Sequence, residues 1–281
     1  MVKPRIAVLT PVYNEADTLP VMLRGLLRQT LKPFKVLVGD NESVDGSPEV
    51  ARSVLEGRVR YRIVRVRRDP RIGKWNINNV YWLLSRVLEV ESEVYDYVAT
   101  IEADVLLEPR YFEKLVKYFE RDPKLCVTGG RLEPLGLMKD PFPLRRVSVM
   151  LWGGNRLYRA GCWNQINREV DLRRLPTWDT DHVLIALLKG WHVYQAPSAK
   201  SVAMRSIKMP KGSSKGVMDA LHGLPLWWAI YKAVEYADLG YLTGYVASRL
   251  TKSRGLRELQ ELYYRAALTV VADRVRGTYK Y

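Results

Sequence analysis

The sequence predicts an α/β protein with a mostly parallel sheet flanked by helices, followed by a helical C-terminal extension. Short apolar runs, typical of buried parallel strands, recur in the first hundred residues, and segments with leucines at helical spacing separate them. Strands that alternate with helices along a chain favour a sheet with parallel connections. Residues 217–281 instead predict two or three consecutive helices.

The elements of the first hundred residues are predicted in a regular order. The run 6–9, closed by Pro11, predicts a strand, and the leucines of 19–27 predict a helix after it. The same patterns predict strands at 36–38, 59–63 and 97–101, and helices at 46–56 and 76–90. Later elements are less regular: we expect loops from about residue 130 to 177, a helix at 178–190 and a mobile basic loop at 206–216.

The composition fits a globular chain that forms a core. Its 281 residues, 47% of them hydrophobic, suffice for one large domain or for one domain with a helical appendage. No run of 18 uncharged apolar residues and no signal peptide is recognisable, so we expect a cytoplasmic protein without a membrane span. The two cysteines, Cys126 and Cys162, are expected to be small buried residues rather than a disulfide framework.

The formal net charge is +15, from 45 Lys and Arg against 30 Asp and Glu. Such an excess favours phosphate-bearing partners, namely a nucleotide sugar, a nucleic acid or an anionic membrane surface. A charged, solvated surface of the kind that hot habitats favour is the competing interpretation. Charge alone does not choose between them.

Polar side chains follow three of the predicted strands, at 11–15, 40–45 and 102–104. Ligands of parallel α/β sheets bind at the carboxyl ends of the strands. These three segments are therefore the first candidates for a binding site. They are polar or acidic although the chain as a whole is basic.

The acidic pair Glu102 and Asp104, on either side of Ala103, would suit a hard divalent cation, Mg²⁺ or Mn²⁺. Such an ion binds through one or two carboxylates plus substrate phosphate oxygens, and it can neutralise a departing diphosphate. A solvated loop with two incidental acids is the alternative.

The other two strand ends carry groups suited to a nucleotide. Asp40 could accept a hydrogen bond from a base or ribose, while the residues after it cap the next helix. Tyr13 could stack on a base with Glu15 near ribose hydroxyls, although a lone loop tyrosine is more often a packing residue. Arg71 and Lys74 precede a predicted helix and would suit a diphosphate, or form one more solvated basic turn.

Two acids, Asp179 and Asp181, open the predicted helix at 178–190. Either could take a proton from an acceptor hydroxyl as a general base, and either could simply cap the helix.

The sequence has no G-x-x-x-x-G-K-[ST] phosphate loop, no G-x-G-x-x-G after the first strand and no histidine cluster suited to zinc. ATPase, NAD-dependent and zinc-enzyme functions therefore lose support.

Taken in order, these segments resemble the family 2 glycosyltransferases of the GT-A fold, whose mostly parallel sheet is Rossmann-like. The resemblance spans residues 5–195 and rests on segments 7–15, 38–46, 73–79, 102–104 and 179–190. These are similar to the family's P-x-Y-N-E loop, its D-D-x-S-x-D-G segment, its G-K-x-x-x-L-N stretch, its D-x-D motif and its E-D motif.

The resemblance implies an inverting hexosyltransferase that moves a sugar from a UDP- or GDP-sugar to a hydroxyl or phosphate of a glycan or lipid-linked acceptor. Asp179 takes the place of the general base, with Asp181 as the second candidate, and Asp104 with Glu102 that of the metal site. The implied donor-binding residues are Pro11, Tyr13, Glu15, Asp40, Arg71, Lys74, Glu102, Ala103 and Asp104. The implied domains are a catalytic domain at 1–215, with a donor half at 1–105 and an acceptor half at 106–215, and the helical extension at 216–281.

Three residues depart from the family pattern. Asn41 stands for the second Asp of D-D, Glu102 for the first Asp of D-x-D, and Trp178 for the Glu of E-D. The longer Glu102 changes the reach of that side chain. Trp178 lies on the expected acceptor side, where it could stack against a sugar face.

The aromatic-rich segment 224–250 and the basic run after it allow two interpretations. The helices could lie on a membrane surface near a lipid-linked acceptor, or pack on the catalytic domain or in a homodimer.

Two other functions compete with glycosyl transfer: sugar nucleotidyl transfer, and nucleic-acid binding through the basic surface. Acidic strand ends disfavour the latter, so we expect no nucleic-acid partner.

Overall fold

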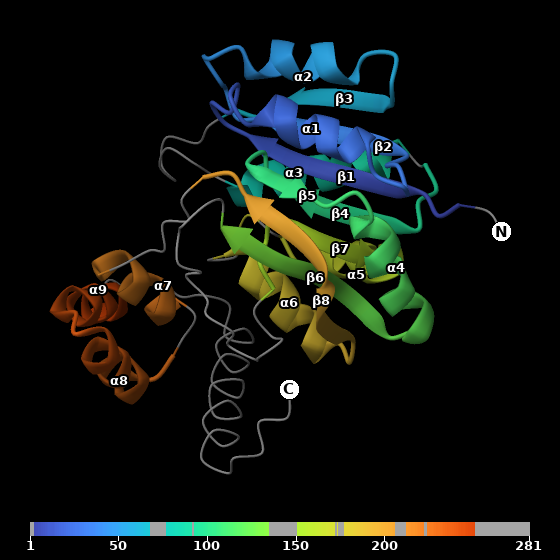
Figure 1. The fold of residues 1–281 in the computed structure, drawn as a ribbon. Coiled ribbons are helices and arrows are strands. Elements are labelled where there is room, and N and C mark those ends of the chain that lie inside the picture. Colours follow the sequence, from blue (N-terminus) through green and yellow to red (C-terminus); the bar gives the residue numbers. More distant parts are fainter. Residues whose placement is uncertain are drawn as a thin grey trace. The chain divides into compact units, whose positions relative to one another are not determined.

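The computed structural model describes residues 3–67, 77–91, 93–134, 151–171, 173, 177–205, 212–221 and 224–250. Over these residues the strands form one eight-stranded sheet in the order β3-β2-β1-β4-β7-β6-β8-β5 (Figure 1). The strands are β1 (Ile6–Val12), β2 (Lys35–Asp40), β3 (Arg60–Arg65), β4 (Tyr97–Ile101), β5 (Val105–Leu107), β6 (Leu125–Pro134), β7 (Asn155–Arg159) and β8 (His192–Ala203).

Helices connect and cover these strands. They are α1 (Leu19–Leu27), α2 (Ser47–Leu55), α3 (Ile77–Val90), α4 (Tyr111–Arg121), α5 (Ala160–Glu169), α6 (Trp178–Leu188), α7 (Ser213–Leu221), α8 (Leu226–Tyr236) and α9 (Leu239–Leu250). Strand β1 pairs in parallel with β2 and β4, and β2 with β3. The α/β class and the mostly parallel sheet are therefore confirmed.

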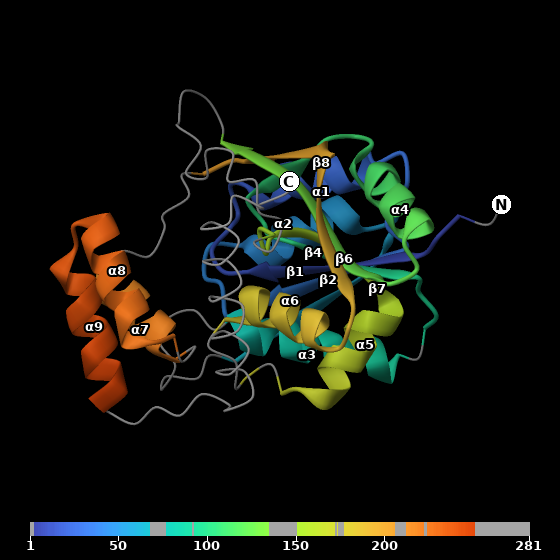
Figure 2. The same cartoon turned by 90° about the horizontal axis from the view of Figure 1, so that it is seen from below.

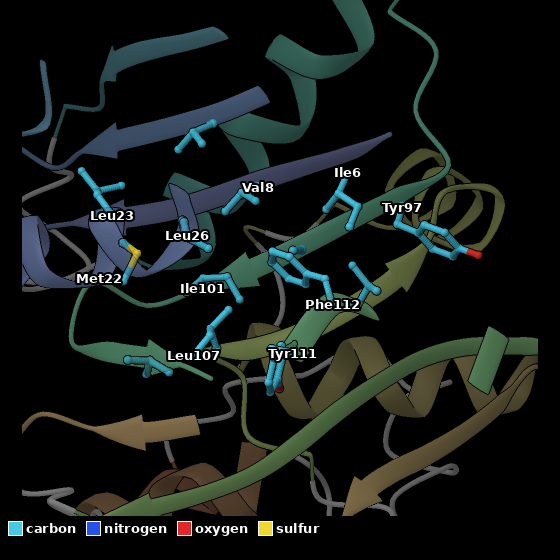
Figure 3. Close-up of a cluster of buried hydrophobic side chains, with 14 of the residues drawn as sticks. Ile6, Val8, Met22, Leu23, Leu26, Tyr97, Ile101, Leu107, Tyr111 and Phe112 are labelled. Atoms are coloured by element: carbon cyan, nitrogen blue, oxygen red, sulfur yellow. The ribbon is translucent and has the colours of Figure 1, made fainter. Parts of the chain in front are cut away.

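The main core lies between one face of the sheet and helices α1, α2 and α4, which Figure 2 shows on the same side. Ile6 and Val8 of β1 meet Leu23 and Leu26 of α1 in this core, and Phe112 of α4 extends it (Figure 3). Each such side chain, fully buried, contributes roughly 1.5–3 kcal/mol. The leucine periodicity that predicts α1 is thus the pattern of its buried face.

Helix α3 covers the opposite face of the sheet and packs closely on β2. A Cβ atom at Gly39 would lie 2.4 Å from Cγ1 of Val80 and 3.1 Å from Cδ1 of Leu84. Only glycine therefore allows this approach. The contact holds α3 against the end of β2, immediately before Asp40.

Buried hydrogen bonds join α4 to the middle of the sheet. The Tyr111 hydroxyl donates to the carbonyl oxygen of Asn155 at 2.5 Å and accepts from the amide of Gly130 at 2.6 Å. The Asn155 Nδ2 donates to the Gly130 carbonyl at 3.2 Å and to the Ser201 hydroxyl at 2.8 Å. Burial raises the pKa of Tyr111, so its hydroxyl stays a donor.

The chain divides into two compact units, one of residues 1–173 and 189–207 and the other of 174–188 and 208–281. The first contains the sheet with α1–α5, and the second contains α6–α9. In the second, α7 and α9 touch through their backbones, because a Cβ on Gly244 would lie 2.1 Å from the Ser213 carbonyl oxygen. The boundary between domains at 215 and 216 stays a prediction.

Two sequence-based expectations about loops are wrong. Residues 130–177 do not form only loops, because β6 runs to Pro134 and both β7 and α5 lie in this range. The sequence of strand β7 does not alternate apolar and polar residues. Its Arg156 is buried and donates to the Trp152 carbonyl at 3.0 Å instead of facing solvent. The predicted basic loop at 206–216 ends earlier, because α7 begins at Ser213; residues 206–211 lie outside the described part.

The expectation that the cysteines form no disulfide is also wrong. Cys126 of β6 and Cys162 of α5 are fully buried, as expected, but they are bonded to each other, with Cα atoms 5.4 Å apart. They are 36 residues apart in the sequence, and strand β7 lies between them along the chain. Two cysteines without a known fold carry no sign of this pairing.

Breaking this disulfide should destabilise the protein. A closed loop of this length contributes about 2–4 kcal/mol to the free energy of unfolding, mainly by restricting the unfolded chain. We expect reductant to lower the unfolding free energy of the wild type by that amount in denaturant titrations. The double variant C126A/C162A serves as control and should not respond to reductant; equal wild-type stability with and without reductant would contradict the prediction.

Candidate active site

The ends of three neighbouring strands bring the predicted donor residues to one edge of the sheet. In the parallel register Pro11 lies beside Gly39 and Val12 beside Asp40, while Leu9 lies beside Thr100 of β4. The segments after β1, β2 and β4 therefore adjoin one another. Arg71 and Lys74, which the resemblance places near a base or diphosphate, lie outside the described residues.

Hydrogen bonds join the loop after β1 to the loop after β2. The amide of Asn14 donates to the Ser43 hydroxyl at 3.0 Å, and the amide of Val44 donates to Oδ1 of Asn14 at 2.9 Å. The Ala16 amide donates to Asp45 at 2.9 Å. Burial raises the pKa of Asp45, but hydrogen bonds from its neighbours outweigh burial and lower it, so the acid stays ionised. The two loops thus form one surface.

Both loops contain a strained residue. Asn14 has a φ of 54° and Glu42 a φ of 60°, the left-handed region that residues with a Cβ rarely adopt. The hydrogen bonds between Asn14 and the loop after β2 hold Asn14 in its left-handed conformation. Strain of this kind is often found where a protein presents groups to a ligand.

Asp40 lies at the end of β2 with 4% of its surface exposed. Its Oδ1 accepts a hydrogen bond from the Ser43 amide at 3.1 Å, so the carboxylate orders the turn that follows β2. Tyr13 is half-buried in the loop after β1. Contacts of Asp40 and Tyr13 with a nucleotide stay predictions.

Charged side chains gather between the end of β1 and the end of β8. The Glu15 carboxylate accepts from the Thr18 hydroxyl at 2.9 Å and pairs with Arg205 at 2.7 Å; Arg205 also pairs with Asp17. Burial raises the pKa of Glu15, and the charge of Asp104 raises it further, which places Asp104 near this group. Burial likewise raises the pKa of Asp104.

Arg205 is a residue of this cluster that the sequence analysis missed. It follows β8 by two residues. Its positive charge opposes the rise in pKa that burial causes at both Glu15 and Asp104. In a chain with 45 Lys and Arg residues, no motif marks this one. Only the pairing of β8 with β5 and β6 carries it to the end of β1, beside Glu15.

Glu102 and Asp104 flank Ala103 at the end of β4. The Glu102 side chain is half-buried, and its amide donates to the Gly154 carbonyl at 3.0 Å. The Ala103 side chain belongs to the main core, and the residue as a whole is 3% exposed, so it presents almost no surface to a ligand.

The residues at the end of β4 fit a hard divalent cation. Glu102 and Asp104 supply carboxylate oxygens, the ligands that Mg²⁺ and Mn²⁺ prefer, and Asp104 is partly desolvated. Within the described ranges, no three or more His, Cys, Asp or Glu side chains are grouped as a metal site. A cation held by one or two carboxylates together with substrate phosphates matches this donor set.

The second unit presents the candidate bases at the start of α6. Asp181 is fully buried, and its Oδ2 accepts from the Thr177 amide at 2.8 Å, which caps the helix. Asp179 is partly exposed, and its Oδ1 accepts from the Thr180 amide at 2.8 Å. Trp178 is only 3% exposed, so its proposed stacking against a sugar stays a prediction.

The fold and site define a GT-A-type α/β domain with acidic strand ends. The sequence profile described as Glycosyl transferase family 2 matches residues 7–171, more than half of the chain. The chain therefore belongs to glycosyl transferase family 2.

Individual relatives are distant. EpsH of Bacillus subtilis (strain 168), named as a glycosyltransferase, is 22% identical over 142 residues, which cover 50% of this chain and 38% of EpsH. Undecaprenyl-phosphate 4-deoxy-4-formamido-L-arabinose transferase of Pectobacterium carotovorum subsp. carotovorum (strain PC1) is 28% identical over 117 residues, 40% of this chain and 33% of that protein. The chain thus spans less than half the length of these two relatives.

Solved structures agree with the fold. The mannosyltransferase PcManGT of Pyrobaculum calidifontis, solved with GDP-Man and Mn²⁺, superposes with a TM-score of 0.58 at 18% identity over 96% of this chain and 81% of that one. TarS 1-349 of S. aureus, solved with UDP-GlcNAc, gives a TM-score of 0.58 at 12% identity over 89% of this chain and 73% of that one. At these identities the likeness establishes the GT-A fold alone.

The strain at Glu42 gives a stability prediction. Replacing Glu42 with glycine removes the left-handed penalty, whereas replacing it with alanine keeps it, and both changes remove the same carboxylate. We expect Glu42→Gly to unfold with a free energy about 1 kcal/mol higher than Glu42→Ala. Urea denaturation of the two variants measures the difference. Equal stabilities would mean that the backbone is not strained at this residue.

Proposed function

We propose that this chain is an inverting glycosyltransferase that moves a sugar from a UDP- or GDP-sugar to an acceptor hydroxyl or phosphate, with Mg²⁺ or Mn²⁺ as cofactor. The observation that carries the proposal is the edge of the sheet where the ends of β1, β2 and β4 adjoin. There the hydrogen-bonded loops at 11–15 and 40–45 lie next to the acids Glu102 and Asp104. The GDP-Man and Mn²⁺ bound by the neighbour PcManGT support this donor chemistry.

The residues of the donor side have separate tasks in this proposal. Asp104, with Glu102, would hold the cation, which when bound neutralises charge on the diphosphate. Tyr13, Glu15 and Asp40 would hold the nucleoside, because Tyr13 and Glu15 lie in the loop after β1 and Asp40 ends β2, where hydrogen bonds join the two loops. Arg71 and Lys74 would contact the base or the diphosphate, as the family resemblance implies.

Asp179 is the general base in this mechanism. It would take the proton of the acceptor hydroxyl while the oxygen attacks the anomeric carbon and the nucleoside diphosphate leaves, in one step with inversion. The two candidate acids differ in burial: Asp181 is fully buried and caps α6, whereas Asp179 keeps part of its surface exposed. An acceptor can therefore reach Asp179 more readily than Asp181.

Membership in family 2 favours glycosyl transfer over the two competing functions, sugar nucleotidyl transfer and nucleic-acid binding. The acidic strand ends argue in the same direction, because they repel a phosphate backbone. The absence of a nucleic-acid partner stays a prediction.

Two variants separate donor binding from chemistry. Asp104→Ala should lose the thermal stabilisation that a nucleoside diphosphate with Mn²⁺ gives the wild type, because donor binding stabilises only the folded state. Asp179→Asn should keep that stabilisation but lose roughly 10²–10⁴-fold in turnover. Asp181→Asn serves as the matched comparison for the base. Unchanged turnover in Asp179→Asn would refute the base assignment.

The acceptor is proposed to be lipid-linked, with the helical unit in contact with an anionic membrane. The name of the Pectobacterium relative includes an undecaprenyl phosphate. Helix α8 exposes Leu226, Trp227, Ile230 and Val234, spaced so that they share one helical face, to between 44% and 77%. The sequence after α9 is basic, which suits anionic lipid. In the part of the chain that is described, no helix is long and apolar enough to cross a membrane.

Vesicle flotation tests this contact. The wild type should float with vesicles containing phosphatidylglycerol at low salt, less so at high salt, and little with phosphatidylcholine alone. Ile230→Glu should lose flotation, whereas Val94→Glu, equally charged but on an exposed residue of the first unit, should not. If Ile230→Glu instead converts a dimer to a monomer without changing flotation, the face belongs to a second copy of the chain.

A further inference from the structure

Glu102 lies opposite Gly154 where β4 and β7 end. Ile101 pairs with Asn155 in the antiparallel register, so the next pair outward joins Glu102 to Gly154. The Glu102 amide donates to the Gly154 carbonyl at 3.0 Å and continues the pairing. Residues directly opposite each other in such a pair project to the same face of the sheet. A side chain at residue 154 would therefore point where the Glu102 side chain lies.

The Glu102 side chain fills the space above Gly154. A Cβ atom at Gly154 would lie 2.5 Å from Cδ, 2.6 Å from Oε2 and 2.7 Å from Cγ of Glu102, and these are the three nearest atoms. Non-bonded carbon atoms do not approach so closely. The φ of Gly154 is not positive, so its backbone conformation does not by itself require glycine. The group that a side chain at residue 154 would displace is the Glu102 carboxylate.

The segment that contains Gly154 is held from both sides. The Thr100 hydroxyl donates to the Gly153 carbonyl at 2.9 Å, and the Asn155 side chain donates to Gly130 and Ser201. The backbone at 154 is thus fixed to three strands. If a side chain were added there, the flexible end of Glu102 would have to move.

We propose that Gly154 is a positioning residue for Glu102. By lacking a side chain, it sets where the Glu102 carboxylate lies at the edge of the sheet where β1, β2 and β4 end. This inference rests on the proposed role of Glu102 in donor and metal binding. It also explains how the chain accommodates glutamate beside Asp104, since the extra methylene of the side chain occupies the space above Gly154.

A double-mutant cycle tests the proposal. Affinities for UDP and GDP with Mn²⁺ are measured by titration calorimetry in wild type, Gly154→Ala, Glu102→Ala and the double variant. We expect Gly154→Ala to weaken binding about tenfold, as loss of a positioning group does at metal sites. The same change in the Glu102→Ala background should have no effect, because the three clashing atoms are gone. Gly161→Ala is the matched control, since a Cβ there meets nothing within 4 Å.

The outcomes separate this inference from the proposed function. Equal losses from Gly154→Ala in both backgrounds, or no loss in either, would overturn the positioning role. If the wild type binds neither nucleotide, the proposed function fails, and a crystal structure of Gly154→Ala then decides the inference alone. A displaced Glu102 carboxylate with an unmoved backbone would support it, and an unmoved carboxylate would overturn it.

Discussion

The pairing of β7 between β4 and β6 is the constraint on which the rest of the first unit depends. β7 runs antiparallel to both neighbours and so joins the parallel strands β1–β4 to the strands that follow. The hydrogen bonds of Tyr111 and Asn155 are made in the dry interior, where an unpaired polar group costs about 1–3 kcal/mol. These bonds fix the start of β7, and through it the end of β4 with its acids.

The edge of the sheet where β1, β2 and β4 end concentrates acids in a protein whose overall charge is +15. Burial raises the pKa of Glu15 and Asp104, and Arg205 opposes that rise in both. An acidic group of this kind attracts cations, whereas the net positive charge of the whole chain attracts phosphate. The proposed ligand, a diphosphate with a divalent cation, would satisfy both.

Elements with a regular pattern could be predicted from the sequence, and those whose identity depends on tertiary neighbours could not. α1 and α2 were predictable because their buried faces follow helical periodicity, and β4 because it is a short, mostly apolar run that is buried along its whole length. β7 was not, since Arg156 is buried and satisfied by carbonyl groups. At the site, motif residues such as Asp104 could be named in advance. Arg205 and Gly154 acquire meaning only through residues distant in the chain, Glu15 and Glu102.

The disulfide between Cys126 and Cys162 has a consequence for local opening. Proteins open transiently in cooperative segments, and a helix at the edge of a domain is often among the first to detach. The bond ties α5 to β6, so α5 cannot leave the sheet while β6 stays in place. Strand β7, which begins directly after Gly154, lies within the loop of chain that the disulfide closes. Amide protons of β7 should thus exchange with solvent only in the larger, rarer openings that also disrupt β6.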